Sequence, residues 1–181
     1  PFVTPAFEEK IQQCIVLPTI EGFEKRNLSF VGFVFIGLIK VGDDPYVIEY
    51  NVRMGDPETE VVLPRVKNDL VEVLLATSKG ELDKITLEED PRAATTVMLV
   101  SGGYPEAYEK GKAIKGLSKG KMIFHAGTKI IDGQVQTSGG RVLAVTSMAE
   151  EHKIALLNSY TTLSKLSFEG INYRKDIGFD L

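Results

Sequence analysis

Residues 47–58 of the chain read VIEYNVRMGDPE, and this stretch decides how the first half of the sequence is interpreted. Residues 46–53 are predicted to form a strand, because aromatic and β-branched residues alternate there with polar ones. Alternate side chains of a strand share one face. We therefore expect Glu49, Asn51 and Arg53 to project together from the same side, close to the end of the strand.

These three side chains suit a site that binds a metal ion and a nucleotide. The oxygens of Glu49 and Asn51 are hard ligands of the kind that Mg²⁺ prefers, with phosphate oxygens completing its shell. Arg53 carries the planar guanidinium that holds a phosphate through two parallel hydrogen bonds. Such a site neutralises the charge of a phosphoryl group. The spacing is also typical of an amphipathic strand with a solvated face and a Glu–Arg pair, and by itself it does not decide between the two.

The segments before this strand predict a helix followed by an antiparallel hairpin. Thr4 is expected to cap a helix that covers residues 5–25, and Pro18 should kink or split it. Residues 30–40, FVGFVFIGLIK, are typical of a buried strand. A turn at residues 42–45 then connects the two strands of the hairpin.

Two helices are predicted after the hairpin. Asp56 is expected to cap the first of them, with Pro57 as its first helical residue. The second begins at Asn68-Asp69 and stops near Gly80. Residues 87–92 are charged and contain a proline, which favours a domain boundary near residue 90.

The second half of the chain is mostly β. Its Asp-Gly pair at residues 132–133, between hydrophobic residues, is a strong signal of a two-residue hairpin. We therefore expect an α+β chain, with a first part over residues 1–90 and a smaller, mainly antiparallel β domain with one long helix over residues 91–181. The elements predicted there are strands over residues 93–100, 121–126 and 141–147, and a helix over residues 148–166.

Composition narrows the class of protein. With 43% hydrophobic and 25% charged residues, the chain is ordinary for a globular protein with a core. Its net charge of −4 argues against a nucleic-acid surface. No apolar stretch approaches the ~20 residues of a membrane-spanning helix, so we expect no membrane partner. The single cysteine, Cys14, excludes an internal disulfide and favours a reducing, cytoplasmic location.

Other candidates for chemistry give weaker signals. Cys14 lies on a predicted helix face and is more typical of a core residue than of a catalyst. His152 is expected to be solvated on a helix surface. Two separated histidines and one cysteine lack the spacing of a zinc site. Residues 102–105, GGYP, lack the lysine and the helix of a phosphate-binding loop.

Residues 47–58 resemble the signature of the phosphoribosylamine–glycine ligases over most of its length. The resemblance extends over essentially the whole chain, because other segments resemble the family in the same order. These segments are residues 1–5, Leu63-Pro64-Arg65, Asp69-Leu70, Gly102-Gly103-Tyr104-Pro105, His125-Ala126-Gly127-Thr128, Gly139-Gly140-Arg141-Val142 and Arg174-Lys175-Asp176-Ile177-Gly178.

This resemblance implies that the first part completes an ATP-grasp domain and that the second is the family's C-terminal domain. The family joins glycine to 5-phosphoribosylamine in purine biosynthesis, forming a C–N bond through glycyl phosphate and converting ATP to ADP and phosphate. It therefore implies Mg²⁺ or Mn²⁺ as the cofactor, ATP as co-substrate, and glycine and phosphoribosylamine as small-molecule partners.

Carried over residue by residue, the resemblance assigns roles within residues 47–58. It makes Glu49 and Asn51 the Mg²⁺ ligands. Arg53 becomes a catalytic contact to phosphate. Asp56 and Glu58 are expected either to face the glycine ammonium group or to order their loop, and helix capping is the alternative role of Asp56.

The resemblance implies further contacts in the second half. His125 is either a hydrogen-bonded structural residue or directed toward the active site. Gly140 and Arg141 form either a tight turn or a set of backbone amides and an arginine for a substrate phosphate. Arg174 and Lys175 belong either to a solvated tail or to a loop that closes over the nucleotide or the neighbouring domain.

The chain also departs from the family pattern. The family's N-terminal domain and the portion that covers the nucleotide are expected before Pro1. We therefore expect the chain alone to be inactive, and to self-associate through uncovered apolar surface. Two alternatives stay open: another ATP-grasp carboxylate–amine ligase or carboxylase, and a non-catalytic folded fragment.

Overall fold

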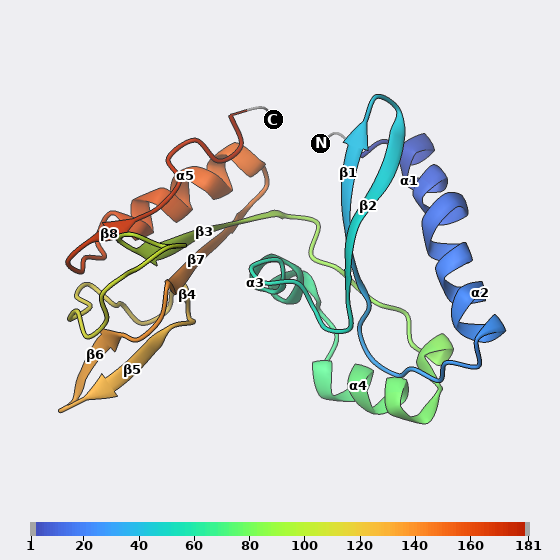
Figure 1. Ribbon diagram of the computed structural model, residues 1–181, viewed down its shortest axis with the longest axis horizontal. Coiled ribbons are helices and arrows are strands. Elements are labelled where there is room, and N and C mark those ends of the chain that lie inside the picture. Colours follow the sequence, from blue (N-terminus) through green and yellow to red (C-terminus); the bar gives the residue numbers. More distant parts are fainter. Residues whose placement is uncertain (1–2, 180–181) are drawn as a thin grey trace. The chain divides into compact units, whose positions relative to one another are not determined.

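A computed structural model of the chain describes residues 3–179 (Figure 1). Within these residues the chain divides into two compact units. The first contains residues up to Gly55 together with Asn68–Thr86, and the second contains Asp56–Lys67 and the residues from Leu87 onward. Each unit is described by itself below.

The first unit opens with a helix whose middle turn is widened. The helix runs through α1 (Pro5–Ile11), a π-helical segment (Gln12–Val16) and α2 (Leu17–Lys25). Thr4 caps it as predicted, because its hydroxyl accepts a hydrogen bond from the amide of Phe7. The predicted interruption at Pro18 is confirmed and takes the form of the π-helical segment. Proline has no amide hydrogen and its ring crowds the carbonyl four residues earlier, and a widened turn accommodates both effects.

The predicted hairpin is confirmed as β1 (Phe35–Val41) paired antiparallel with β2 (Asp44–Asn51). The predicted burial of residues 30–40 is wrong. Val31 is 65% exposed and Ile39 is 50% exposed. The β-branched residues of this segment are typical of a core strand, but here they lie in a two-stranded sheet. Such a small sheet buries few of its side chains.

The helix α4 (Leu70–Lys79) is confirmed with both of its predicted ends. Asp69 caps it by accepting a hydrogen bond from the amide of Val71, and Gly80 ends it in the left-handed region at φ 68°. A 3-10 turn, Leu82–Lys84, follows. The predicted cap at Asp56 is wrong: the helix is the short α3 (Thr59–Val62), and Glu58 occupies the cap position. The carboxylate of Asp56 instead makes a long-range ion pair, described below.

The second unit is built on a four-stranded antiparallel sheet in the order β4-β7-β3-β8. Helix α5 (His152–Leu163) packs against β3 and β7. The helix was predicted to begin at residue 148, and it begins later because the strand before it continues to Ala149. The strands are β3 (Ala93–Ser101), β4 (Met122–His125), β7 (Arg141–Ala149) and β8 (Ile171–Asn172), and the core consists of Val97, Leu99, Ile114, Val142, Leu143, Val145, Leu163, Leu166 and Phe168.

A separate hairpin, β5 (Thr128–Ile131) and β6 (Gln134–Thr137), confirms the signal of the Asp-Gly pair. Asp132 and Gly133 have φ values of 49° and 75°. Both residues are therefore in the left-handed region that a two-residue hairpin turn requires.

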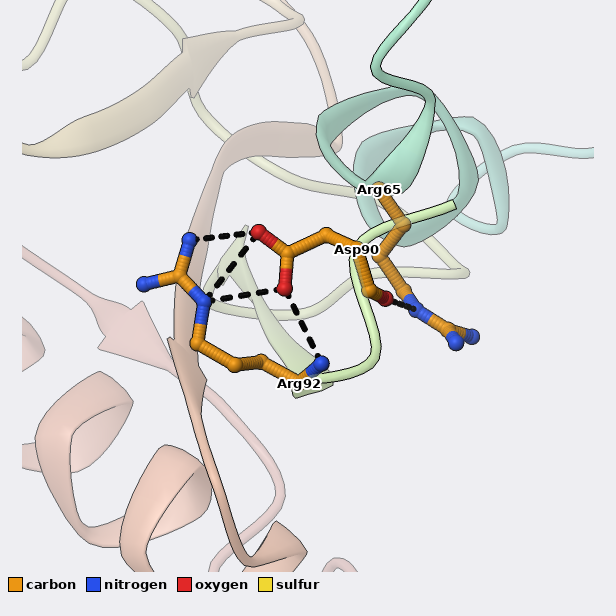
Figure 2. Close-up of polar contacts among 3 residues, drawn as sticks. All are labelled: Arg65, Asp90 and Arg92. Atoms are coloured by element: carbon orange, nitrogen blue, oxygen red, sulfur yellow. Dashed lines mark hydrogen bonds and ion pairs between the residues drawn. The ribbon is translucent and has the colours of Figure 1, made fainter. Parts of the chain in front are cut away.

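Residues 56–67 are fastened to the second unit by an antiparallel bridge and by charged side chains. The amide of Asp90 donates to the carbonyl of Arg65 at 2.7 Å, and the amide of Lys67 donates to the carbonyl of Glu88 at 2.9 Å. Figure 2 shows Arg92 lying across the Asp90 carboxylate, with its Nη2 2.7 Å from Oδ2, while Arg65 donates to the Asp90 carbonyl from the other side. These contacts tie the α3 segment to the start of β3.

Two predictions about single side chains are wrong. Cys14, expected in the core, is exposed. His152, expected in solvent, is half-buried, and its Nε2 atom is buried without a hydrogen-bond partner. Both errors come from helix positions at which the sequence period does not identify the covered face. Among residues 3–179, no helix combines the length and the apolar character needed to cross a membrane.

The Asp90 cluster predicts a pH-dependent stability. Hydrogen bonds from Arg92 lower the pKa of the Asp90 carboxyl, so the charged form stabilises the fold above the unfolded pKa and this stabilisation is lost as the pH falls. Asp90→Asn should therefore lower the melting temperature at about pH 7 and about pH 5, and the deficit should shrink below about pH 4. Thermal unfolding followed by circular dichroism measures it.

The matched control is Asp132→Asn in the exposed turn of the β5–β6 hairpin. Its difference from the parent chain should stay constant over the same pH range. An Asp90→Asn deficit that is equally large in acid would contradict the assigned role of the carboxylate charge.

Candidate functional site

Glu49 and Asn51 lie side by side near the end of β2. The Asn51 Nδ2 atom donates to Glu49 Oε1 at 2.9 Å, so the two side chains share one face of the strand as predicted. Gly37 faces Glu49 across the hairpin, and a Cβ atom on Gly37 would approach Glu49 Cγ to 3.1 Å. The absence of a side chain at Gly37 therefore leaves room for the carboxylate.

This pair fits a hard divalent cation that is shared with a phosphorylated ligand. The described residues contain no group of three or more His, Cys, Asp and Glu side chains that could enclose a metal ion. Mg²⁺ commonly takes only one or two protein ligands and keeps water or phosphate oxygens for the rest. The Glu49 carboxylate and the Asn51 side-chain amide, which share one face of the strand and are joined by a hydrogen bond from Asn51 Nδ2, supply oxygens of this kind.

Arg53 lies beyond the end of β2 and is exposed. Its Nη1 atom donates to the carbonyl of Met54 at 3.0 Å. The strand ends at Asn51, so the strict alternation that would place Arg53 beside Glu49 and Asn51 does not extend to it. The assignment of Arg53 as a phosphate contact stays a prediction.

The second unit brings together two candidates that are 85 residues apart in the sequence. Arg141 Nη2 lies 2.9 Å from Asp56 Oδ2, and Arg141 Nη1 donates to the Asp56 carbonyl at 2.9 Å. The Asp56 and Arg141 side chains are 46% and 38% exposed. Both charged groups are therefore within reach of a ligand.

Glu60 stands near this pair and was missed by the sequence analysis. Burial raises the pKa of the Glu60 carboxyl, the neighbouring carboxylates of Asp56 and Glu58 raise it further, and Arg141 lowers it. Its Oε2 atom is buried without a hydrogen-bond partner. The only sequence signal for it was its position four residues after Asp56 on a short helix. Glu58 is exposed and makes no capping hydrogen bond through its side chain.

The Gly139-Gly140 bend that precedes Arg141 is held by hydrogen bonds to its carbonyl oxygens. The amide of Ser101 donates to the carbonyl of Gly140 at 2.8 Å, and the Ser101 hydroxyl donates to the carbonyl of Gly139 at 2.9 Å. The amide of Gly127 donates to the carbonyl of Arg141 at 2.8 Å. The end of β3 and the turn after β4 are therefore joined to the start of β7.

The remaining candidates make local contacts. His125 ends β4, is exposed, and has its Nδ1 atom 3.0 Å from the hydroxyl of Thr128. Arg174 donates to both carboxylate oxygens of Asp176 at 3.0 Å, and this lowers the pKa of Asp176. The Tyr160 hydroxyl donates to the carbonyl of Arg174 at 2.7 Å and holds this segment on α5. Lys175 is exposed.

The candidates thus fall into two groups, one in each unit. Glu49, Asn51 and Arg53 belong to the first unit, and all the others belong to the second. Direct contacts join Glu49 to Asn51 and Asp56 to Arg141. No such contact is described between His125, Lys175 and the other candidates, and their roles stay predictions.

Two family models match most of the chain. A model described as phosphoribosylglycinamide synthetase, ATP-grasp (A) domain, matches residues 1–59. A model described as phosphoribosylglycinamide synthetase, C domain, matches residues 94–180. They occur in the order in which the two parts were expected from the sequence.

Curated and solved proteins give the same picture. A phosphoribosylamine–glycine ligase from Chlorobaculum tepidum is 42% identical over 98% of this chain and 43% of its own length. A bifunctional purine biosynthetic protein from Pichia angusta is 43% identical over 98% of this chain and 23% of its own length. The crystal structure of a phosphoribosylamine–glycine ligase from Thermotoga maritima matches with a TM-score of 0.86 and 37% identity, over 97% of this chain and 44% of that one.

A pyruvate carboxylase from Rhizobium etli matches with a TM-score of 0.63 and 17% identity over 99% of this chain. At this identity the match shows a shared fold alone. The chain spans less than half the length of the curated ligases that it matches.

The Asp56–Arg141 pair predicts a small coupling energy in the free energy of unfolding. A double-mutant cycle with Asp56→Ala, Arg141→Ala and both together should give about 0.5–1 kcal/mol, because both groups are substantially exposed. Denaturant unfolding measures it, and Glu21 with Lys25, an exposed pair on α2, supplies the comparison cycle. A coupling energy of zero would contradict a stabilising role for this pair.

Proposed function

The chain belongs to the phosphoribosylglycinamide synthetase family, and on this premise we propose that it is the C-terminal part of a ligase that joins glycine to 5-phosphoribosylamine. The reaction makes glycinamide ribonucleotide for purine biosynthesis and converts ATP to ADP and phosphate. The observation that carries the proposal is the Glu49–Asn51 pair on β2, which lies in the segment that matches the ATP-grasp model.

The chemistry divides into two steps. The glycine carboxylate attacks the γ-phosphorus of ATP, so that glycyl phosphate forms and ADP leaves. The amine of phosphoribosylamine then attacks the acyl carbon, and the C–N bond forms as phosphate leaves. The first step brings an anionic carboxylate to an anionic phosphate, so the site must neutralise phosphate charge, and both steps need the reacting groups held in place.

The first group of residues serves the nucleotide. Glu49 and Asn51 would hold Mg²⁺, or Mn²⁺, through a carboxylate and an amide oxygen. When bound, the ion neutralises phosphate charge by Lewis-acid polarisation. Arg53, exposed just after the strand, contacts a phosphate oxygen, for which its planar guanidinium is suited.

The second group serves the two other substrates. Asp56 accepts hydrogen bonds from the ammonium group of glycine, and Glu58, two residues later, is assigned to the same group. Arg141 holds the phosphate of phosphoribosylamine and is directed by the buried bend at Gly140, and we assign His125 to the same substrate. The pairing of Asp56 with Arg141 supports this assignment. It places an anionic hydrogen-bond acceptor beside a cationic hydrogen-bond donor, and both side chains stay partly exposed to solvent.

The remaining assignments concern the rest of the ligase. Arg174 and Lys175 close over the nucleotide or a neighbouring domain, and the ATP-grasp part ends near residue 90. The longer relatives support the proposal that further N-terminal domains complete the nucleotide site. The 181-residue chain alone would then be inactive, would self-associate through exposed apolar residues such as Ile48 and Val52, and would belong in the cytoplasm.

The proposal predicts the behaviour of Glu49→Gln in the complete ligase. ADP release should require both glycine and phosphoribosylamine with Mg-ATP, and the variant should lose about a hundredfold or more of that rate, ~3 kcal/mol. Asp43→Asn, in the turn of the same hairpin with its side chain 96% exposed, is the control and should keep the rate.

The outcomes separate the claims. If the parent enzyme releases no ADP with this pair, the substrates are wrong, and other carboxylates, including those of carboxylases that share the fold, should be screened. If Glu49→Gln keeps full activity, the metal assignment is wrong.

The proposal also predicts a role for Asp56 in glycine binding. Asp56→Asn removes the charge that attracts the ammonium group, so the KM for glycine should rise by about tenfold or more while the KM for ATP stays close to that of the parent. Steady-state kinetics in the complete ligase measures both values. A rise of less than about tenfold for glycine would leave Asp56 with a structural role only.

A further inference from the structure

Tyr104 occupies the space that a side chain at Gly140 would need. A Cβ atom on Gly140 would come within 3.0 Å of both Cδ2 and Cε2 of the Tyr104 ring. Gly140 is buried, whereas Tyr104 is 38% exposed. The ring therefore lies against the backbone at Gly140 and covers it from solvent.

The covered backbone is the one that aims Arg141. Gly140 directly precedes Arg141, and the Ser101 amide holds the Gly140 carbonyl from the β3 side. The Tyr104 ring prevents the Gly139-Gly140 bend from moving toward it, because the ring already fills that space. With both in place, the guanidinium of Arg141 reaches Asp56 at 2.9 Å.

The loop that carries Tyr104 is itself tightly built. A Cβ atom on Gly103 would overlap the carbonyl of Ala107, and one on Gly102 would lie 2.8 Å from the carbonyl of Gly170. The amide of Tyr104 donates to the carbonyl of Ser101 at 3.1 Å. The ring is therefore held by the loop and is not merely resting on the bend.

We propose that Tyr104 is a positioning residue that fixes the Gly140–Arg141 backbone and thereby the Arg141 guanidinium that receives the substrate phosphate. The proposal rests on the proposed function, which gives Arg141 its ligand. The ring carbons Cγ, Cδ2 and Cε2 are the atoms nearest to the place where a Gly140 side chain would lie, so the aromatic ring and not the hydroxyl group carries the role.

The test compares the complete ligase with variants that remove the Tyr104 ring or keep it. Tyr104→Ala should raise the KM for phosphoribosylamine by about tenfold or more, with kcat, and the KM values for ATP and glycine, changed far less. Tyr104→Phe keeps the contacting carbons and should stay within about twofold of the parent in all four values. Tyr108→Ala is the matched control. The centroid of the Tyr108 ring lies 6.1 Å from that of Tyr104, and the atoms nearest to a Gly140 side chain all belong to Tyr104.

Gly140→Ala supplies the complementary change, because its methyl group collides with the ring. It should raise the same KM, and the double variant Tyr104→Ala with Gly140→Ala should be less impaired than the two single effects combined, since the methyl group then enters space that the ring has left. If Gly140→Ala does not fold, Tyr104→Ala and Tyr104→Phe still decide the question.

The outcomes are distinct. A parent enzyme inactive with phosphoribosylamine overturns the proposed function itself. An active parent in which Arg141→Lys leaves the KM for phosphoribosylamine unchanged overturns the ligand of Arg141. If Arg141→Lys raises that KM but Tyr104→Ala does not, or if Tyr104→Phe is as impaired as Tyr104→Ala, the positioning role is overturned.

Discussion

The antiparallel ladder between β3 and β7 is the constraint on which the second unit depends. Val97 and Leu99 on one strand and Val142, Leu143 and Val145 on the other are fully buried. The three on β7 lie on both faces of that strand, and the two strands pair Val97 with Val145 and Leu99 with Leu143. The register in turn places Ser101 beside the bend that precedes Arg141.

A second constraint brings Asp56 to that place. The segment 56–67 is held on the second unit by the antiparallel bridge between Val66 and Glu89 and by backbone hydrogen bonds to residues 88 and 90. The Asp90 carboxylate accepts hydrogen bonds from three nitrogens of Arg92, one in the backbone and two in the guanidinium. Arrangements of this kind contribute modestly to stability but fix geometry well. Here they determine which charged groups Asp56 can meet.

The sequence predicted those features that local chemistry controls. The caps at Thr4 and Asp69, the stop at Gly80, the interruption at Pro18 and the Asp-Gly hairpin all follow from backbone preferences of one or two residues, and all are confirmed.

The failures come from contacts between distant parts of the chain. Asp56 has every local qualification of a helix cap, yet its carboxylate faces Arg141, 85 residues away. The raised pKa of Glu60 and the buried nitrogen of His152 likewise depend on neighbours that no spacing reveals. For the site, the pairing of Glu49 with Asn51 was predictable from alternation, whereas the pairing of Asp56 with Arg141 was not.

The division of the chain has a consequence for how such proteins can diversify. Within residues 3–179 the polypeptide passes between the two units after Gly55, after Lys67 and after Thr86. A single genetic crossover at any one of these points would exchange only part of a unit. Exchange after Thr86, for example, would leave the inherited Asp56 to pair with a foreign Arg141. Such an exchange would keep this ion pair only if the incoming sequence had an arginine at the position of Arg141.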